Sequence, residues 1–198
     1  MMPTVQQAQA ALREAEARNP GAWADHSRYA AAACRAIAAR CPGLDADIAY
    51  SLGLLHDVGR RVGRCRDRHM AEGYRYCRAQ GWDKAAQICI SHGYMAQDIA
   101  TGLDNADYTP ADYAEVDAFL KTAVYDDYDR LVQLCDALAL PTGFCLLETR
   151  FVDVALRYGT LPGLADRWRA VLAIKKHFEA LMGCPLYAVL PGAADHHL

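Results

Sequence analysis

Apolar and polar residues along this chain follow the spacing of helices rather than strands. Alanine and leucine, both good helix formers, are abundant, and runs of strict apolar–polar alternation between turn residues are hard to find. Breaks that contain proline and glycine, such as residues 19–21 and 41–43, divide the chain into segments. The pattern predicts an irregular segment over residues 93–110 and helices over residues 4–18, 23–40, 45–59, 69–80, 83–92, 111–124, 128–140, 146–158 and 163–182.

The segment over residues 45–59 differs from the others because its apolar residues are almost continuous, so we expect a buried central helix. A chain of 198 residues is long enough to bury a core and favours one domain. No internal repeat or low-complexity linker interrupts it. We therefore predict an all-α, single-domain helical bundle over residues 1–198, with a core over about 22–140 and C-terminal helices over about 146–182.

Composition and charge narrow the function classes. Hydrophobic residues make up 53% and charged residues 23%, and the net charge of −3 argues against a protein that holds nucleic acid by bulk charge. No two of the eight cysteines are separated by only two residues, so the usual zinc-finger pairs are absent and we expect buried free thiols. Free thiols, a polar N-terminal segment and no membrane-length apolar run predict a cytoplasmic protein without membrane or nucleic-acid partners.

A histidine and an aspartate stand side by side at the end of the central apolar segment. The phrase AYSLGLLHDVGR places His56 and Asp57 directly before Val58 and Gly59. Adjacent side chains on a helix point in different directions, but an ion at the end of the helix can reach both. Imidazole and carboxylate are natural ligands of divalent transition metals. The pair alone is weak evidence, because such residues also cap helices and form salt bridges.

Four further residues strengthen the metal interpretation when they are taken together. His26, His69 and His92 lie within or at the ends of predicted helices, and Asp136 lies in an apolar stretch where a carboxylate needs a partner. Each also has a structural interpretation, as a surface or helix-end histidine or as an aspartate paired with an arginine. Their joint occurrence in one helical chain favours a shared site.

These residues resemble the pattern of the HD-domain superfamily of metal-dependent phosphohydrolases. That family is named for a histidine, a His-Asp pair and a distant aspartate, which match His26, His56, Asp57 and Asp136. The phrase AYSLGLLHDVGR is similar to the family's central helix almost residue for residue. The resemblance covers roughly residues 22–140 and implies an all-α bundle with a metal site in its interior.

Two histidines extend the resemblance. His69, in HMAEGY, and His92, in ISHGY, fall where members with two metals carry their additional ligands. The resemblance therefore implies one or two divalent transition-metal ions (Fe, Mn, Zn, Ni or Co), with Asp57 bridging in the two-metal case. The implied ligands are His26, His56, Asp57, His69, His92 and Asp136.

The activity implied by the resemblance is hydrolysis of a phosphate ester, as a phosphomonoesterase or phosphodiesterase on a nucleotide or other small phosphorylated metabolite. A metal would lower the pKa of water and polarise a phosphoryl oxygen. Asp57 is then a ligand that also orients the attacking water, and His69 or His92 is a candidate proton donor. Arg60 stands where relatives carry Lys or Arg near the substrate.

Other charged residues have two interpretations each. The individual arginines after Arg60 are typical of a solvated loop, but as a group they could draw an anionic substrate; they are Arg61, Arg64, Arg66 and Arg68. Two interpretations stay open for three residues farther along the chain, which either form an ion-pair network or reach the pocket. These residues are Glu148, Arg150 and Arg157.

Two alternatives stay open beside the hydrolase. Myo-inositol oxygenase and phosphonate-cleaving relatives resemble the same superfamily and use the six-ligand pattern to hold two irons, so the ligands alone do not exclude a mixed-valence di-iron oxygenase. A non-catalytic helical module that binds a metal or a ligand is the other. The identity of the substrate and of the metal, and assembly into a homo-oligomer through the apolar C-terminal helices, also stay open.

Overall fold

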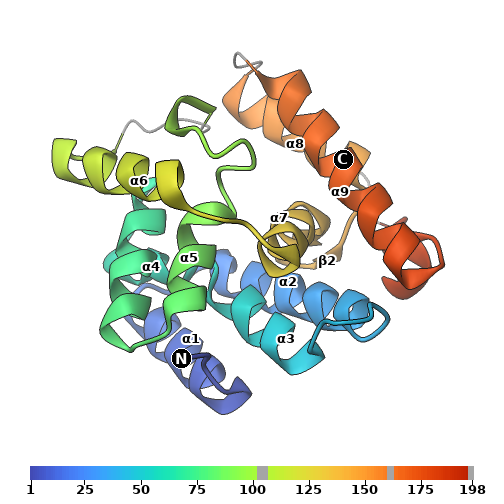
Figure 1. Cartoon of the computed structure of the whole chain (residues 1–198), viewed down its shortest axis with the longest axis horizontal. Coiled ribbons are helices and arrows are strands. Elements are labelled where there is room, and N and C mark those ends of the chain that lie inside the picture. Colours follow the sequence, from blue (N-terminus) through green and yellow to red (C-terminus); the bar gives the residue numbers. More distant parts are fainter. Residues whose placement is uncertain (102–106, 160–162, 196–198) are drawn as a thin grey trace.

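The computed structural model of this chain describes residues 1–101, 107–159 and 163–195. Helices form most of it, as Figure 1 shows. In chain order they are α1 (Val5–Arg18), α2 (Ala22–Ala38), α3 (Ala46–Leu55), α4 (Arg68–Ala79), α5 (Asp83–Ser91), α6 (Pro110–Thr122), α7 (Asp127–Leu138), α8 (Leu147–Tyr158) and α9 (Leu164–Met182). The described residues also form three short 3-10 helices and two strands: η1 (Val58–Val62), η2 (Ile99–Thr101), η3 (Leu186–Val189), β1 (Ala139–Leu140) and β2 (Gly143–Phe144).

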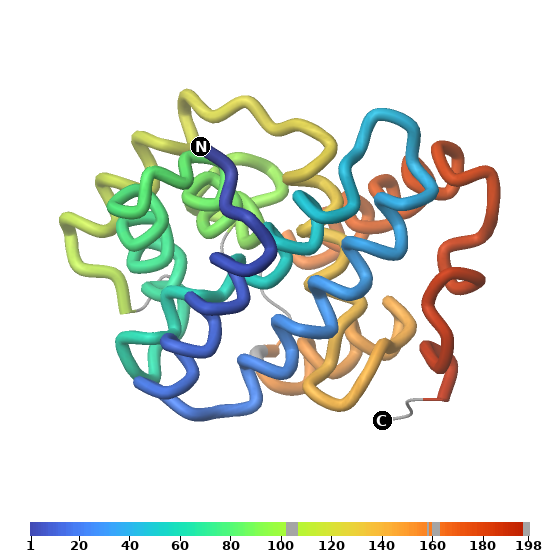
Figure 2. The backbone as a smooth tube through the Cα atoms, turned by 90° about the horizontal axis from the view of Figure 1, so that it is seen from below, coloured from blue at the N-terminus to red at the C-terminus, as the bar shows by residue number. Residues whose placement is uncertain are grey.

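The helices are arranged around a central pair. Helices α2 and α3 pack against each other, and α7 packs on both of them. Helix α1 lies against α3 and η1, and in Figure 2 it is seen in front, beside α2. The α4–α5 pair and α6 cover one side of this centre, and α8 and α9 cover the other (Figure 1). The confirmed fold class is all-α.

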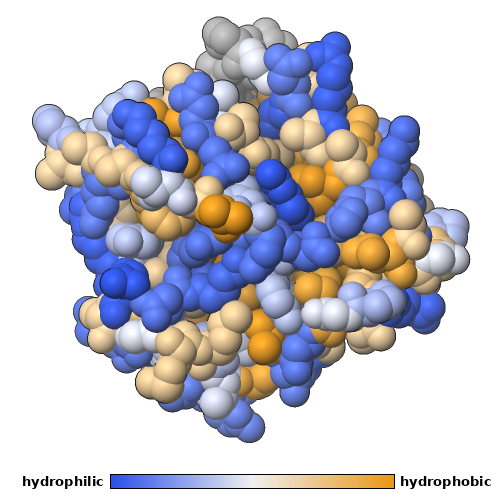
Figure 3. Space-filling view, viewed as in Figure 1, coloured by the Kyte–Doolittle hydropathy of each residue, from blue (hydrophilic) through white to orange (hydrophobic). Residues whose placement is uncertain are grey.

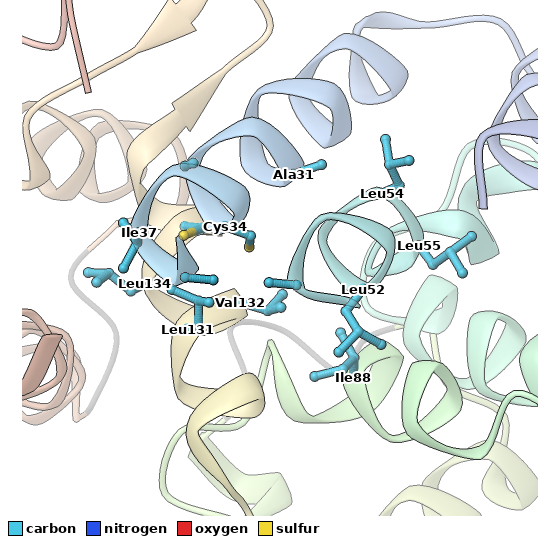
Figure 4. Close-up of a cluster of buried hydrophobic side chains, with 14 of the residues drawn as sticks. Ala31, Cys34, Ile37, Leu52, Leu54, Leu55, Ile88, Leu131, Val132 and Leu134 are labelled. Atoms are coloured by element: carbon cyan, nitrogen blue, oxygen red, sulfur yellow. The ribbon is translucent and has the colours of Figure 1, made fainter. Parts of the chain in front are cut away.

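The core lies where α2, α3, α5 and α7 meet. Figure 4 shows Cys34 and Ile37 of α2, Leu52 of α3 and Leu134 of α7 in one cluster, and all four side chains are fully buried. Burying a leucine or isoleucine side chain contributes about 1.5–3 kcal/mol each, so this contact fixes the helices that carry the polar residues described below.

Two close backbone approaches set the spacing of these helices. A Cβ on Gly53 would lie 2.7 Å from the Cα of Ala31, so α2 and α3 touch through their backbones. A Cβ on Gly59 would lie 1.9 Å from the carbonyl oxygen of His69 and 2.4 Å from the nitrogen of Gly73. Only glycine fits at Gly59, and its missing side chain lets the start of α4 press against the His-Asp turn.

The predicted helices are present, but two expectations about their ends are wrong. The central helix ends at Leu55 rather than Gly59, so His56 and Asp57 lie in a turn before η1. The helix expected over 128–140 ends at Leu138 and is followed by a short antiparallel pair, β1 with β2. The residue before a proline avoids the helical region, and Leu140 precedes Pro141.

The predicted irregular segment over 93–110 contains η2 and the first residue of α6, and its residues 102–106 lie outside the described ones. All eight cysteines are free thiols, and six of them are buried, as expected. On the face shown in Figure 3, hydrophilic residues interleave with small hydrophobic patches. Among the described residues, none of the helices has the length and apolar character needed to cross a bilayer.

Candidate metal centre and basic cavity

Five elements bring the predicted ligand residues to one place. His26 comes from the second turn of α2, His56 and Asp57 from the turn after α3, and Asp136 from the last turn of α7. The other two histidines flank this turn: His69 opens α4 and His92 follows α5. Four helices and one turn, widely separated in sequence, thus point six polar side chains into one interior region.

The first half of the cluster is built on Asp136. Its Oδ1 lies 2.9 Å from Nε2 of His26 and 3.8 Å from Nε2 of His56, and the two imidazole Nε2 atoms are 3.3 Å apart. The other ring nitrogen of His26, Nδ1, lies 3.1 Å from the carbonyl oxygen of Ala139. Because both of its ring nitrogens face oxygens, a cation, either a proton or a metal ion, is required between His26 and Asp136.

The second half is built on Asp57. Its Oδ1 lies 2.9 Å from Nε2 of His69 and 3.7 Å from Nε2 of His92. Its Oδ2 lies 4.0 Å from Nε2 of His56 and accepts a 2.6 Å hydrogen bond from Nε of Arg60. Asp57 therefore links the two halves.

Backbone carbonyls fix the orientation of all four histidine rings. Nδ1 of His56 lies 2.7 Å from the carbonyl oxygen of Gly53, and Nδ1 of His92 lies 3.1 Å from that of Ile88. His69 makes the same contact with the carbonyl of Arg66, as His26 does with Ala139. A carbonyl only accepts, so each Nδ1 donates and each Nε2 turns its lone pair toward the cluster. Metal-ligating histidines are commonly oriented in this way.

The residues present fit a divalent metal ion. Two groups of ligand atoms, His26–His56–Asp57 and Asp57–His69–His92, each lie within 4.8 Å of one another. Within the described part of the chain, Asp57 Oδ1 and His69 Nε2 are buried and have no hydrogen-bond partner, although they are only 2.9 Å apart. Two facing lone pairs at that distance repel unless a cation lies between them. Nitrogen and oxygen donors of this kind suit first-row transition metals.

Burial and charge keep these groups in the protonation states that bind a metal. Burial lowers the pKa of His56 and lowers that of His92 to about 3, so both rings are neutral near pH 7. Burial by itself would raise the pKa of Asp57, but nearby positive charge, above all the Arg60 guanidinium, holds it well below its ordinary value. Burial by itself would also raise the pKa of Asp136, but its contacts with His26 and the other histidines together lower it.

The cluster lies at the bottom of a cavity of about 770 Å³. His26, Asp57, His69, His92 and Asp136 line it, while His56 lies behind them and is fully buried. Ligand pockets in proteins span about 300–1,000 Å³, so the cavity is large enough for a small metabolite.

Six arginines line the same cavity: Arg60, Arg64, Arg66, Arg150, Arg157 and Arg167. Two arginines of the predicted basic loop point elsewhere, since Arg61 pairs with Glu14 at 2.5 Å and Arg68 with Glu72 at 3.0 Å. Arg64, Arg66 and Arg68 are exposed, as the solvated-loop interpretation expects, and Arg64 and Arg66 also line the cavity.

The C-terminal charges resolve a choice that the sequence left open. Arg150 and Arg157 both line the cavity and both pair with Asp153, at 3.1 and 2.5 Å, so they belong to the pocket and to an ion-pair network at once. Glu148 instead lies 3.4 Å from the hydroxyl of Tyr187.

The sequence did not single out Arg167. The spacing of Arg150, Val154 and Arg157 along one helix face was a usable signal, but nothing in the sequence places α9 beside them.

The all-α bundle and its interior His/Asp cluster define a protein of the HD-domain superfamily. Within that superfamily, the HDOD domain family matches residues 3–111 of this chain, more than half of its length. The chain belongs to the HDOD domain family. No curated protein and no solved structure matches it.

The region matched by the family contains only some of the residues that form the site. It covers His26, His56, Asp57, His69 and His92 and ends before α7, which carries Asp136. Helices α8 and α9, with their three cavity arginines, also lie beyond it. The residues that complete the first half of the cluster and the far wall of the cavity are thus outside the matched region.

Proposed function

We propose that this protein is a metal-dependent phosphohydrolase that acts on a small phosphorylated metabolite such as a nucleotide. The observation that supports this most is the joint presence of oriented histidine lone pairs and unsatisfied carboxylate oxygen at the bottom of an arginine-lined cavity. A cluster for transition metals within a basic pocket suits hydrolysis of an anionic ester.

In this proposal His26, His56, His69, His92, Asp57 and Asp136 hold one or two divalent ions. Such an ion, when bound, lowers the pKa of water and polarises a phosphoryl oxygen. Asp57, which faces both halves of the cluster, orients the attacking water through a carboxylate oxygen. Arg60, fixed by its 2.6 Å bond to Asp57, places positive charge at the cavity wall, where it offsets charge on the phosphoryl group.

The reaction is a simple hydrolysis. The water oxygen gives up a proton and forms a bond to phosphorus, the bond from phosphorus to the ester oxygen breaks, and the leaving oxygen takes up a proton, so that only water is consumed. Of the two predicted donors, both of which line the cavity, His69 is the candidate to deliver that proton through water when it holds no ion, because His92, with its pKa lowered to about 3, carries no proton at Nε2 near pH 7.

The deciding experiment measures metal content and phosphate release on the same protein. We expect one or two Fe, Mn, Zn, Ni or Co ions per chain and release of phosphate from members of a panel of nucleotides and simple phosphate esters. His56→Ala and Asp57→Ala should lose both properties. His177→Ala is the matched control, because His177 is exposed and pairs with Asp127 at 2.9 Å, away from the cavity.

Three results would contradict the proposal. Metal-loaded protein that releases no phosphate from the panel would do so, as would release that persists in both variants. A mixed-valence di-iron signal with substrate-dependent oxygen uptake would identify an oxygenase instead.

One observation favours a second candidate, a non-catalytic ligand-binding module. HDOD domains are often signalling modules. The Arg60–Asp57 ion pair occupies a carboxylate oxygen that a metal could use and offsets the charge of Asp57 without a metal. This candidate predicts tight binding of a phosphorylated ligand by metal-free protein and no turnover.

A further inference from the structure

The cavity has a second positively charged region, on the wall formed by α8 and α9. Arg150, Val154 and Arg157 line the cavity from one face of α8, at spacings of four and three residues. Arg167 reaches the same cavity from the first turns of α9. This wall shares no residue with the metal cluster and lies beyond the region matched by the family.

Arg167 differs from its neighbours because none of the described carboxylates forms an ion pair with it, although the charges of Asp136 and Asp67 act on it from across the cavity. Arg150 and Arg157 share the carboxylate of Asp153. In the described ranges of the chain, Arg167 makes no hydrogen bond or ion pair. Burial lowers its pKa from the ordinary value, but a guanidinium stays protonated in proteins, so a half-buried positive charge faces the cavity.

A half-buried charge that lacks an ion pair is costly and is normally compensated by a ligand or a neighbouring group. Asp136 raises and Arg150 lowers the pKa of Arg167, so its guanidinium lies within electrostatic reach of both the metal cluster and α8. The described residues of α8 and α9 that line the cavity are Arg150, Val154, Arg157 and Arg167, so the lining of this wall carries positive charge and no carboxylate. Arginine forks match the oxygens of phosphate groups.

We propose that Arg150, Arg157 and Arg167 form a second anion subsite, so that the substrate carries two phosphate groups, one at the metal cluster and one on the α8–α9 wall. The substrate class is a small bisphosphate or a nucleotide with a further phosphate. The assignment of the first phosphate to the metal cluster rests on the proposed function. The arginine subsite itself rests on the cavity wall alone.

Binding of non-hydrolysable probes tests the subsite without requiring turnover. Titration calorimetry compares methylphosphonate, which has one anionic group, with a series of alkane bisphosphonates of increasing spacer length. We expect at least one bisphosphonate to bind about 10- to 100-fold more tightly than methylphosphonate, as one added charge-assisted contact allows.

Arg167→Met should abolish that difference and leave methylphosphonate binding within about threefold, since methionine keeps the apolar stem and removes the charge. Arg169→Met is the matched control, because Arg169 lies on the same helix, is 76% exposed and pairs with Asp166. It should leave both affinities unchanged.

Equal binding of all probes, or a bisphosphonate advantage that survives Arg167→Met, would overturn the subsite. Binding that behaves as expected while phosphate esters are never hydrolysed would overturn the proposed function and keep the subsite. The two proposals therefore fail in different measurements.

Discussion

The His/Asp cluster and the arginine wall on α8 and α9 line one cavity but are built differently. In the cluster, side chains are nearly all buried, and every histidine ring is oriented by a backbone carbonyl. On the wall, Arg150 is 20% and Arg157 48% exposed, and their partner is a side chain one turn away. Rigid placement suits metal ligands, whereas charge alone suits long-range attraction of an anion.

The largest effect should follow from removing one ligand of the cluster. His26→Ala deletes a ring that faces Asp136 at 2.9 Å. Mutating groups that merely support a ligand costs about 10- to 100-fold in metal affinity or activity, so loss of a ligand should exceed about 100-fold. Metal content and phosphate release measure it, with His177→Ala as the control. A variant that keeps its metal and its activity would exclude His26 from the site.

A slightly smaller effect, on the free energy of unfolding, should follow from adding a methyl group where the His-Asp turn touches α4. In Gly59→Ala the new Cβ meets backbone atoms of His69 and Gly73. Overpacking costs about 1–3 kcal/mol, and we expect the upper end because backbone cannot move aside as a side chain does. Gly43→Ala provides the comparison: its Cβ meets nothing within 4 Å, and its positive φ of 85° costs about 1–2 kcal/mol. Urea denaturation measures the free energy of unfolding of both variants. Equal losses in the two would contradict the close approach of Gly59 to α4.

The cluster should also make the metal-free protein sensitive to acid. An unfolded histidine titrates near pH 6.5, but burial lowers the pKa of folded His92 to about 3. Between these pH values unfolding takes up a proton, so the free energy of unfolding falls as the pH falls, by up to about 1.4 kcal/mol per pH unit for each such histidine. Denaturation between pH 6.5 and 4.5 measures the slope.

His92→Gln removes one of the histidines responsible and should flatten that slope. The window ends at pH 4.5 because the lowered pKa values of Asp57 and Asp136 act in the same direction at lower pH. An unchanged slope in the variant would show that His92 takes up a proton in the folded protein. His177→Gln, on the surface, is the control.

The smallest effect should come from the arginine wall, where the substitution is expected to strengthen ligand binding rather than weaken it. Asp153→Asn removes the carboxylate shared by Arg150 and Arg157. Such partly exposed pairs contribute only about 0–1 kcal/mol, so stability should change little. The released arginines should raise bisphosphonate affinity about two- to fivefold, within the energy of such a pair. Calorimetry measures this, and weaker binding would show that Asp153 positions the arginines rather than competing for them.

Local sequence patterns were enough to predict the all-α class and the candidate ligands. Alanine-rich segments with proline and glycine breaks marked the helices, because helix propensity and chain breakers act locally. The order of His26, His56-Asp57, His69, His92 and Asp136 marked the cluster, because these residue types have few uses together in an apolar setting. Local rules misplaced the end of the central helix, which stops at Leu55.

Which charged residues share a cavity depends instead on tertiary packing. Arg61 and Arg66 belong to one basic loop in the sequence, yet one pairs with α1 and the other lines the cavity. Arg167 lies outside that basic loop and reaches the same cavity from α9, far along the chain. Their roles depend on how α1, α8 and α9 pack on the central helices, and such contacts between distant segments leave no local pattern in the sequence.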